Sequence, residues 1–344
     1  MNFHYIDIKR VHFEPTQKCQ AMCPMCDRTL NQHIKDVDFT IDNFKSCIWD
    51  DFKKQLTSFL FCGNHGDPII SNHTLPIIEH LRDVNPNLKI DLITNGGARK
   101  DDFWKALAEL NVNVTFSVDG LWDTNHLYRV NVNWDNVESS MDAFTQAGGK
   151  GRWDYLIFEH NEHQIDEAEQ MAKMFGLTFV KKKTGRWVQA YKQKKVDEKI
   201  TVKGNKVRPA EKEENQNKSV NEYDLLVERH GSFDKYLDQT EINCKSLQAS
   251  EIYISAEGLV TPCCWTASRF YKIYENIGEN QIYKFVRDMK KINILHTPMR
   301  AIVEGDFFQN ISASWNIKSC KKGKAKICAE KCGTGYTAFN DQYG

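Results

Sequence analysis

The chain has 344 residues, and its 46 lysines and arginines balance its 46 aspartates and glutamates, so it has no formal net charge at pH 7. It therefore lacks the basic excess of proteins that bind nucleic acid through the phosphate backbone. It opens MNFHYIDIKR, without the apolar core of a secretory signal, and contains no apolar run long enough to span a membrane, so we expect a cytoplasmic protein. In that reducing compartment, 11 cysteines point to metal binding or catalysis rather than to disulfide bonds.

Three cysteines stand close together in the stretch EPTQKCQAMCPMCDRTL: Cys19, Cys23 and Cys26. The preceding residues, VHFEP, alternate like a strand and end at a proline, which puts the cysteines on a loop at the carboxyl end of a first strand. Disulfide bonds are one alternative. Zinc is another, but a structural zinc site takes four ligands, and no fourth Cys or His follows at the usual spacing. Three thiolates suit an iron–sulfur cluster that leaves one iron open to a small molecule.

Beyond this loop, strand and helix patterns alternate, which is typical of a parallel α/β sheet. The predicted strands after the first cover 58–63, 89–96, 113–120, 155–159 and 177–182. The first predicted helix is capped by Thr40 and carries Ile41, Phe44, Ile48 and Phe52 on one face; the others cover 74–84, 101–111, 136–147 and 163–175. With the first strand this gives six β-α units, which fit either a partial barrel or an open flavodoxin-like sheet.

The cysteine spacing resembles the radical S-adenosylmethionine (SAM) superfamily, whose signature is Cys-x3-Cys-x2-Cys after the first strand of a partial (β/α)6 barrel. The resemblance implies a 4Fe–4S cluster on Cys19, Cys23 and Cys26, with SAM at its open iron. Met25 stands where the family usually has an aromatic residue, and Met can also pack on the adenine ring.

The same resemblance implies SAM contacts at the carboxyl ends of later strands. Gly66 and Asp67, in the sequence GNHGDP, match the last glycine and the glutamate of a Gly-Gly-Glu-Pro motif, although an ordinary Gly/Pro turn would look the same. Asn95 in TNG and Ser117 in SVDG match positions that hold the ribose or methionine part of SAM. Arg129 matches an arginine placed on the SAM carboxylate, for which a guanidinium is well suited.

Residues 191–224 are rich in charge, Asn and Gln and too polar to bury a core of their own, so we predict a linker or flexible segment. A basic arm for nucleic acid is the alternative, but Glu and Asp interrupt its lysines throughout. The predicted division of the chain is a barrel core at 1–187, a charged linker at 188–240 and a small C-terminal α+β domain at 241–344.

The C-terminal part contains a second group of cysteines. EIYISAEGLVTPC, residues 251–263, predicts a β-hairpin. A hairpin followed by distant cysteines resembles the SPASM and twitch extensions of radical SAM enzymes, which carry auxiliary 4Fe–4S clusters. The spacing departs from the full two-cluster pattern, so we expect one auxiliary cluster. Its expected ligands are Cys244, Cys263, Cys328 and Cys332, with Cys320 as the substitute.

Zinc is the alternative metal for this C-terminal group, because four thiolates satisfy zinc equally well. The remaining three cysteines have less defined roles. We interpret Cys47 and Cys62 as plain buried thiols, whereas Cys264 adjoins an expected ligand and fits either role.

The resemblance implies an enzyme that reductively cleaves SAM to a 5′-deoxyadenosyl radical, which then removes a hydrogen atom from a substrate. We expect a peptide or protein side chain as the substrate; the alternative is dehydrogenation or rearrangement of a carbohydrate or nucleotide-like small molecule. A flavodoxin or ferredoxin would supply the electron. No membrane partner is expected, and nucleic acid is disfavoured. A protein that binds zinc or an iron–sulfur cluster without catalysis would not cleave SAM.

Overall fold

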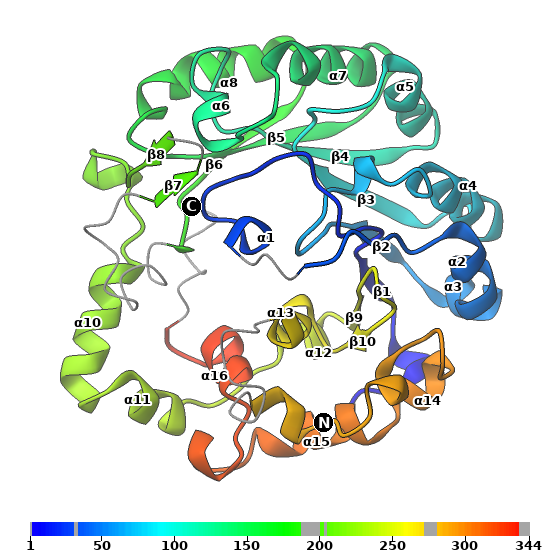
Figure 1. The fold of residues 1–344 in the computed structure, drawn as a ribbon, viewed down its shortest axis with the longest axis vertical. Coiled ribbons are helices and arrows are strands. Elements are labelled where there is room, and N and C mark those ends of the chain that lie inside the picture. Colours follow the sequence, from blue (N-terminus) through cyan, green and yellow to red (C-terminus); the bar gives the residue numbers. More distant parts are fainter. Residues whose placement is uncertain (1, 31–33, 187–199, 203–204, 272–280, 337–344) are drawn as a thin grey trace.

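The computed structural model describes residues 2–30, 34–186, 200–202, 205–271 and 281–336. Eight strands form one sheet in the order β10-β9-β1-β2-β3-β4-β5-β6 (Figure 1). Strands β1 to β6 pair in parallel, each with the next. The strands are β1 Arg10–Phe13, β2 Ser58–Phe61, β3 Lys89–Thr94, β4 Val112–Ser117, β5 Gly151–Leu156, β6 Thr178–Lys182, β9 Glu251–Ile254 and β10 Val260–Thr261.

Helices connect successive strands, and α4, α5, α7 and α8 follow the outer side of the curved sheet (Figure 1). The predicted α/β partial barrel with six β-α units is thus confirmed. The helices of this part are α1 Asp27–Leu30, α2 Ile41–Cys47, α3 Asp50–Gln55, α4 Thr74–Val84, α5 Asp101–Glu109, α6 Asn125–Tyr128, α7 Trp134–Gln146 and α8 Ile165–Met174. Later in the chain come α10 Ser219–His230, α11 Phe233–Gln239, α12 Lys245–Gln248, α13 Cys264–Ser268, α14 Met299–Val303, α15 Asp306–Ser314 and α16 Lys326–Cys332.

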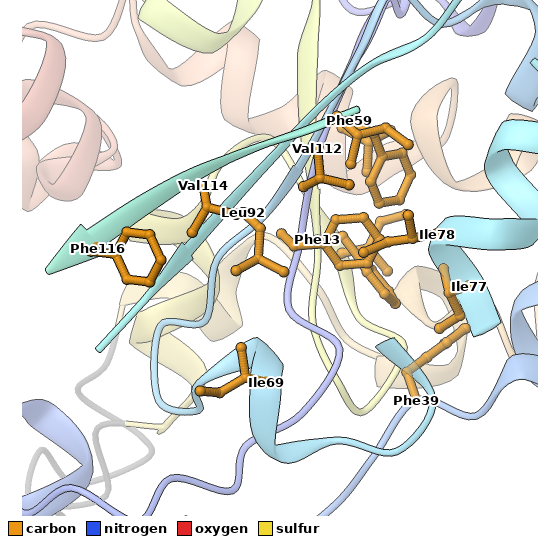
Figure 2. Close-up of a cluster of buried hydrophobic side chains, with 14 of the residues drawn as sticks. Phe13, Phe39, Phe59, Ile69, Ile77, Ile78, Leu92, Val112, Val114 and Phe116 are labelled. Atoms are coloured by element: carbon orange, nitrogen blue, oxygen red, sulfur yellow. The ribbon is translucent and has the colours of Figure 1, made fainter. Parts of the chain in front are cut away.

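The core lies between the sheet and these outer helices (Figure 2). Phe13 on β1 is fully buried and contacts the rings of Phe39, Phe44, Phe59 and Phe61 at centroid distances of 5.4–5.8 Å. Helices join this core through residues three or four positions apart, which share one helix face. On α4 the buried residues are Thr74, Ile77, Ile78 and Leu81.

Two predicted elements differ from the observed bounds by more than the others. Thr40 caps α2 as predicted, since its side chain accepts a hydrogen bond from the Asn43 amide. The helix ends at Cys47, however, because the next residue, Ile48, is extended. A second helix, α3, then starts with two aspartates, which favour a helix N-terminus. The strand predicted at 155–159 is β5, four residues earlier. The prediction missed this start because a glycine and two charged residues interrupt its apolar pattern.

The polar segment predicted as a linker contains regular structure where it is described. β7 Ile200–Val202 pairs antiparallel with β8 Asn205–Val207, and α10 and α11 follow. Val207 and Ala210 are buried in the main core, so this segment packs against the barrel. Tyr236 and Leu237 of α11 form a second, smaller cluster with Ala329 and Tyr336. Residues 187–199 lie outside the described residues.

The predicted C-terminal hairpin is confirmed as β9 and β10, which pair antiparallel. It does not form a separate sheet, because β9 also pairs in parallel with β1 and so extends the barrel sheet. The start of the chain packs on the C-terminal part as well, with the Phe3 and Phe308 rings edge to face at 5.2 Å. No helix in the described parts of the chain is long and apolar enough to cross a membrane.

We expect Phe13→Ala to lower the free energy of unfolding by about 3–5 kcal/mol, because it leaves a cavity where four rings meet. Urea unfolding followed by circular dichroism measures this change. Ile6→Ala is the matched control, since Ile6 is 62% exposed and its truncation creates no buried cavity. Equal losses in the two variants would contradict this description of the core.

Candidate active site

A cavity of about 250 Å³ opens at the edge of the sheet where strands β1 to β6 end. Parallel strands bring their carboxyl ends to one edge, so residues far apart in sequence meet there. All the residues predicted for the cluster and for SAM line this cavity except Met25: Cys19, Cys23, Cys26, Gly66, Asp67, Asn95, Ser117 and Arg129.

The cysteine loop is tied to the barrel by backbone hydrogen bonds. The Asp67 amide donates to the Lys18 carbonyl at 2.9 Å, and the Met22 amide donates to the Val130 carbonyl at 2.9 Å. The loop is also closed internally, because the Cys26 amide donates to the Cys23 carbonyl at 3.0 Å. The backbone of the cysteine loop is therefore held by the loop after β2 and by the residues that follow α6.

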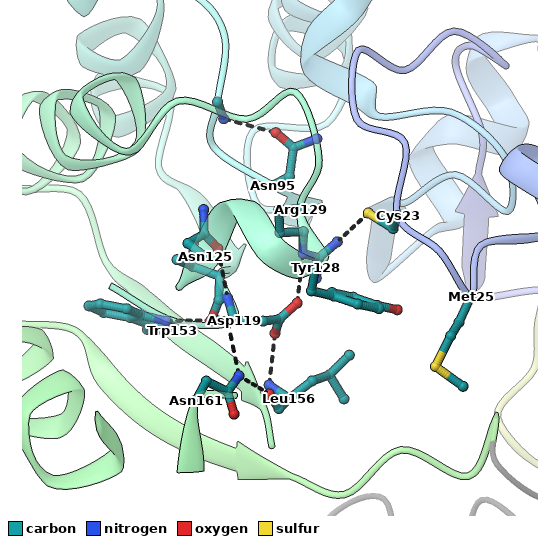
Figure 3. Close-up of polar contacts among 12 residues, drawn as sticks. Cys23, Met25, Asn95, Asp119, Asn125, Tyr128, Arg129, Trp153, Leu156 and Asn161 are labelled. Carbon is teal, nitrogen blue, oxygen red and sulfur yellow. Dashed lines mark hydrogen bonds and ion pairs between the residues drawn. The ribbon is translucent and has the colours of Figure 1, made fainter. Parts of the chain in front are cut away.

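Polar side chains approach two of the three thiols. Asn95 Nδ2 lies 3.8 Å from Cys19 Sγ. A guanidinium nitrogen of Arg129 lies 3.8 Å from Cys23 Sγ, as Figure 3 shows. Burial raises the pKa of both thiols. Their thiolates are thus costly to form in the metal-free protein, and metal coordination is the usual way to offset this cost.

The glycine-containing loop after β2 lies directly against the cysteine loop. A Cβ atom on Gly66 would lie 1.9 Å from the Thr16 carbonyl oxygen, so only glycine fits this contact. Glu14, at the end of β1, accepts hydrogen bonds from the amides of His65 at 2.7 Å and Gly66 at 3.3 Å. The two loops thus form one rigid wall of the cavity.

Asp67 holds Asn95 in place. One carboxylate oxygen of Asp67 accepts hydrogen bonds from the Asn95 amide at 2.8 Å and from its side chain at 2.6 Å, and the other accepts from the Ile69 amide at 3.2 Å. Burial raises the pKa of Asp67. Asp67 therefore positions the side chain that approaches Cys19.

Arg129 forms a buried ion pair with Asp119, whose carboxylate lies 2.7 Å from the guanidinium Nε (Figure 3). Asp119 also accepts a hydrogen bond from the Leu156 amide at 2.8 Å. Burial alone would lower the pKa of Arg129, but the carboxylate of Asp119 outweighs this effect and raises it. Arg129 therefore stays charged and is fixed at the cavity wall.

Met25 differs from the other predicted SAM contacts. Its side chain is buried but does not line the cavity, and in Figure 3 it points away from Arg129 and Cys23. Its carbonyl accepts a hydrogen bond from Arg186 at 2.9 Å. Its packing on adenine stays a prediction.

Sequence reasoning missed several residues that line the cavity. The sequence could have indicated Asp119, because it belongs to the same stretch, SVDG, as the predicted residue Ser117. Lys182 and Asp154 pair across β6 and β5, and burial of Asp154 among apolar strand residues hides it from a pattern search. His65, Tyr128 and Arg186 also line the cavity.

The four predicted auxiliary ligands gather around α12, α13 and α16. Cys244 and Cys263 precede α12 and α13, and Cys328 and Cys332 share one face of α16. Cys328 interacts electrostatically with Cys263 and Cys332. The hydrogen bond between the Cys244 and Cys332 thiols raises the pKa of Cys244 and lowers that of Cys332.

Cys320 differs from these four thiols in its surroundings. Its amide donates to Asp238 at 2.6 Å, and its electrostatic partners are Asp238, Lys324 and Lys326. Burial raises its pKa to about 11. This environment supports the predicted set of four without the substitute.

Cys62 and Cys264 differ from simple core thiols. Cys62 lines the cavity instead of packing in the core, and it interacts electrostatically with Cys264. Cys47 is only partly buried and packs against the core.

No group of three or more His, Cys, Asp or Glu side chains in the described parts of the chain converges closely enough to hold one metal ion. The ligands of a single ion must meet at one point. An iron–sulfur cluster spreads its thiolates over separate irons.

Comparison with solved structures identifies the fold. A structure of anSMEcpe carrying a histidine tag, with bound AdoMet, matches with a TM-score of 0.53 and 16% identity over 97% of this chain and 87% of the other. Native anSMEcpe with bound AdoMet and the Cp18Cys peptide matches with a TM-score of 0.53 and 15% identity, over 97% of this chain and 90% of the other. Streptococcus suis SuiB bound to precursor peptide SuiA matches with a TM-score of 0.56 and 14% identity, over 96% of this chain and 72% of the other.

These neighbours are radical SAM enzymes, and the chain has their fold, a partial barrel with a C-terminal extension. No protein-family model and no curated protein sequence matches the chain.

We expect Asp119→Asn to lower the free energy of unfolding by about 3–5 kcal/mol, because it leaves the Arg129 guanidinium buried without its anion. Urea unfolding measures the loss. In the control variant, Asp91→Asn, the broken pair is with Lys89, whose side chain is 63% exposed, so we expect a loss of about 0.5 kcal/mol or less. A loss no larger for Asp119→Asn than for Asp91→Asn would refute the paired-charge description.

Proposed function

We propose that the protein is a radical SAM enzyme that binds a 4Fe–4S cluster on Cys19, Cys23 and Cys26 and cleaves SAM reductively. One observation carries the proposal: the three thiols, the Gly66 loop and Arg129 line a single cavity at the carboxyl edge of a parallel sheet. Three thiolates leave one iron for a small molecule, and the donor set therefore fits this cluster. The fold shared with AdoMet-bound anSMEcpe supports the same assignment.

When bound, the cluster and SAM together supply a carbon radical that can remove a hydrogen atom from a substrate. The protein's own residues bind and orient. Asp67 fixes Asn95 beside Cys19, and Asp119 fixes Arg129 beside Cys23, so both polar groups are in place before any ligand enters. Gly66 leaves its backbone close to the cysteine loop, where no side chain competes with a ligand.

We propose the Arg129 guanidinium as the partner of the SAM carboxylate, and the loop of Gly66 and Asp67 as the partner of its amino group. Asn95 and Ser117 line the same cavity and are proposed to contact the remainder of SAM. Met25 is proposed to reach adenine only through a change of side-chain conformation, since its side chain lies outside the cavity wall.

We further propose one auxiliary 4Fe–4S cluster on Cys244, Cys263, Cys328 and Cys332. The interactions among these thiols, and the separate surroundings of Cys320, support this set. The part of the chain from 241 to 344 would then be the auxiliary-cluster unit, and 1–187 the SAM-binding unit.

The proposed substrate is a peptide or protein side chain. Support comes from the neighbours, because SuiB is bound to precursor peptide SuiA and anSMEcpe to the Cp18Cys peptide. A flavodoxin or ferredoxin is the proposed electron donor. The proposed location is the cytoplasm, where the cysteines would stay reduced.

The first test of this function uses anaerobic reconstitution with iron and sulfide. We expect two 4Fe–4S clusters per chain in the wild type, and formation of 5′-deoxyadenosine from SAM with dithionite. Replacing Cys19, Cys23 and Cys26 together by Ala should remove one cluster and all cleavage, because no protein ligand of the SAM-binding cluster remains. Cys47→Ala is the control and should keep both clusters and SAM cleavage. Cleavage of SAM by the triple variant would disprove the assignment.

A second test concerns the auxiliary set. Cys263→Ala should remove one cluster while 5′-deoxyadenosine formation persists at least in part, because the SAM cavity contains none of the four auxiliary thiols. Iron and sulfide content and product chromatography measure the two effects. Cys320→Ala should change neither. Zinc in this set after purification without reconstitution, or loss of both clusters from Cys263→Ala, would exclude an auxiliary iron–sulfur cluster.

A further inference from the structure

The loop after β2, residues 63–67, forms part of the cavity wall and also touches the C-terminal part of the chain. Asn64 Nδ2 donates a hydrogen bond to the carbonyl of Cys264 at 2.9 Å. The ring of His65 lies edge to face against Tyr271, with centroids 4.7 Å apart. Cys264 and Tyr271 belong to the segment that begins with Cys263, so the cavity wall and that segment are in direct contact.

A third connection runs through Glu14, which is fully buried. Its Oε1 accepts the amides of His65 and Gly66, and its Oε2 accepts the hydroxyl of Tyr253 on β9 at 2.6 Å. A buried carboxylate that loses one of three donors keeps a large desolvation cost. The hairpin therefore helps to fix the backbone of the loop.

The same hairpin leads to Cys263. Tyr253 lies directly opposite Thr261 in the β9–β10 register. The Thr261 hydroxyl donates to the carbonyl of Cys263 at 2.9 Å. One short strand pair thus joins the residue that holds Glu14 to an expected auxiliary ligand.

We propose that the SAM cavity and the C-terminal cysteine set are thermodynamically coupled through Asn64 and the Tyr253–Glu14 hydrogen bond, so that filling the C-terminal set strengthens SAM binding. The inference rests on the proposed function. Ligation at Cys263 fixes the hairpin and its contacts, so the loop at 63–67 loses less conformational freedom when SAM binds. Coupling of this kind is reciprocal, and SAM in turn strengthens metal retention by the C-terminal set.

The first arm of the test measures SAM affinity by equilibrium dialysis in the reconstituted full chain. Cys328→Ala empties the C-terminal set at α16, a helix outside the connecting residues, and should weaken SAM binding about five-fold or more. Cys320→Ala is the matched cysteine control and should bind SAM as the wild type does. Equal SAM affinity of wild type and Cys328→Ala would overturn the coupling.

The second arm tests the route. Asn64→Ala combined with Tyr253→Phe removes two of the connections while leaving every cysteine in place. In that background, adding Cys328→Ala should leave SAM affinity nearly unchanged, since the two contacts proposed to transmit the effect are gone and only the His65–Tyr271 ring contact is left. Tyr155→Phe is the matched control, because the Tyr155 hydroxyl donates to the Asn161 carbonyl at 2.7 Å on the β5 side of the barrel. In the Tyr155→Phe background, Cys328→Ala should weaken SAM binding as it does in the wild type. A several-fold effect of Cys328→Ala in the double variant would show that the coupling takes another route and refute the proposal.

The third arm needs no variant and covers the case in which Cys328→Ala does not fold. In the wild type, SAM should slow the release of iron from the C-terminal set to a chelator. S-adenosyl compounds that do not bind the protein are the control and should leave the rate of iron release unchanged. Unchanged release with bound SAM would refute the coupling. If the wild type binds no SAM at all, the proposed function itself fails, whereas SAM binding without coupling leaves that function intact. If the C-terminal set holds zinc, the release of zinc with and without SAM is compared instead, with the same expected result.

Discussion

The position of β1 between β2 and β9 is the constraint on which the rest of this structure depends. All three strands run in the same direction, with Val11 aligned to Phe59 on one side and to Ile252 on the other. Their carboxyl ends therefore meet at one edge of the sheet. The cysteine loop leaves β1 there, the Gly66 loop leaves β2 beside it, and the C-terminal hairpin closes the other side.

Buried carboxylates fix these loops at that edge. Glu14, Asp67 and Asp119 are each at most 5% exposed, and each accepts hydrogen bonds from backbone amides of a loop or neighbouring strand. A carboxylate removed from water needs several donors, so each of the three organises the chain around it. The polar groups of the cavity are thereby held in place by the fold before a ligand binds.

How much the sequence predicts depends on whether a feature has a local signal. Cysteine spacing and the ends of apolar runs place Cys19, Asn95 and Ser117 correctly at one edge of the sheet, because parallel topology converts strand order into spatial proximity. Arg129, which follows a short helix, was expected only from the resemblance to the radical SAM family. The direction of the Met25 side chain on an irregular loop has no such signal. The same holds for the docking of β9 on β1, a pairing between segments more than 200 residues apart that no periodicity reveals.

For the C-terminal thiols, sequence spacing alone does not determine which cysteines form one set, and the packing of the chain does. Cys328 and Cys332 meet because one helical turn separates them, whereas Cys320 is one of several candidates by count and is set apart by its contact with Asp238. Metal ligation across Cys263 and Cys328 would close a long loop, which removes chain entropy mainly from the unfolded state. Because the hairpin before Cys263 belongs to the barrel sheet, that stabilisation would act on the SAM cavity as well as on the C-terminal part.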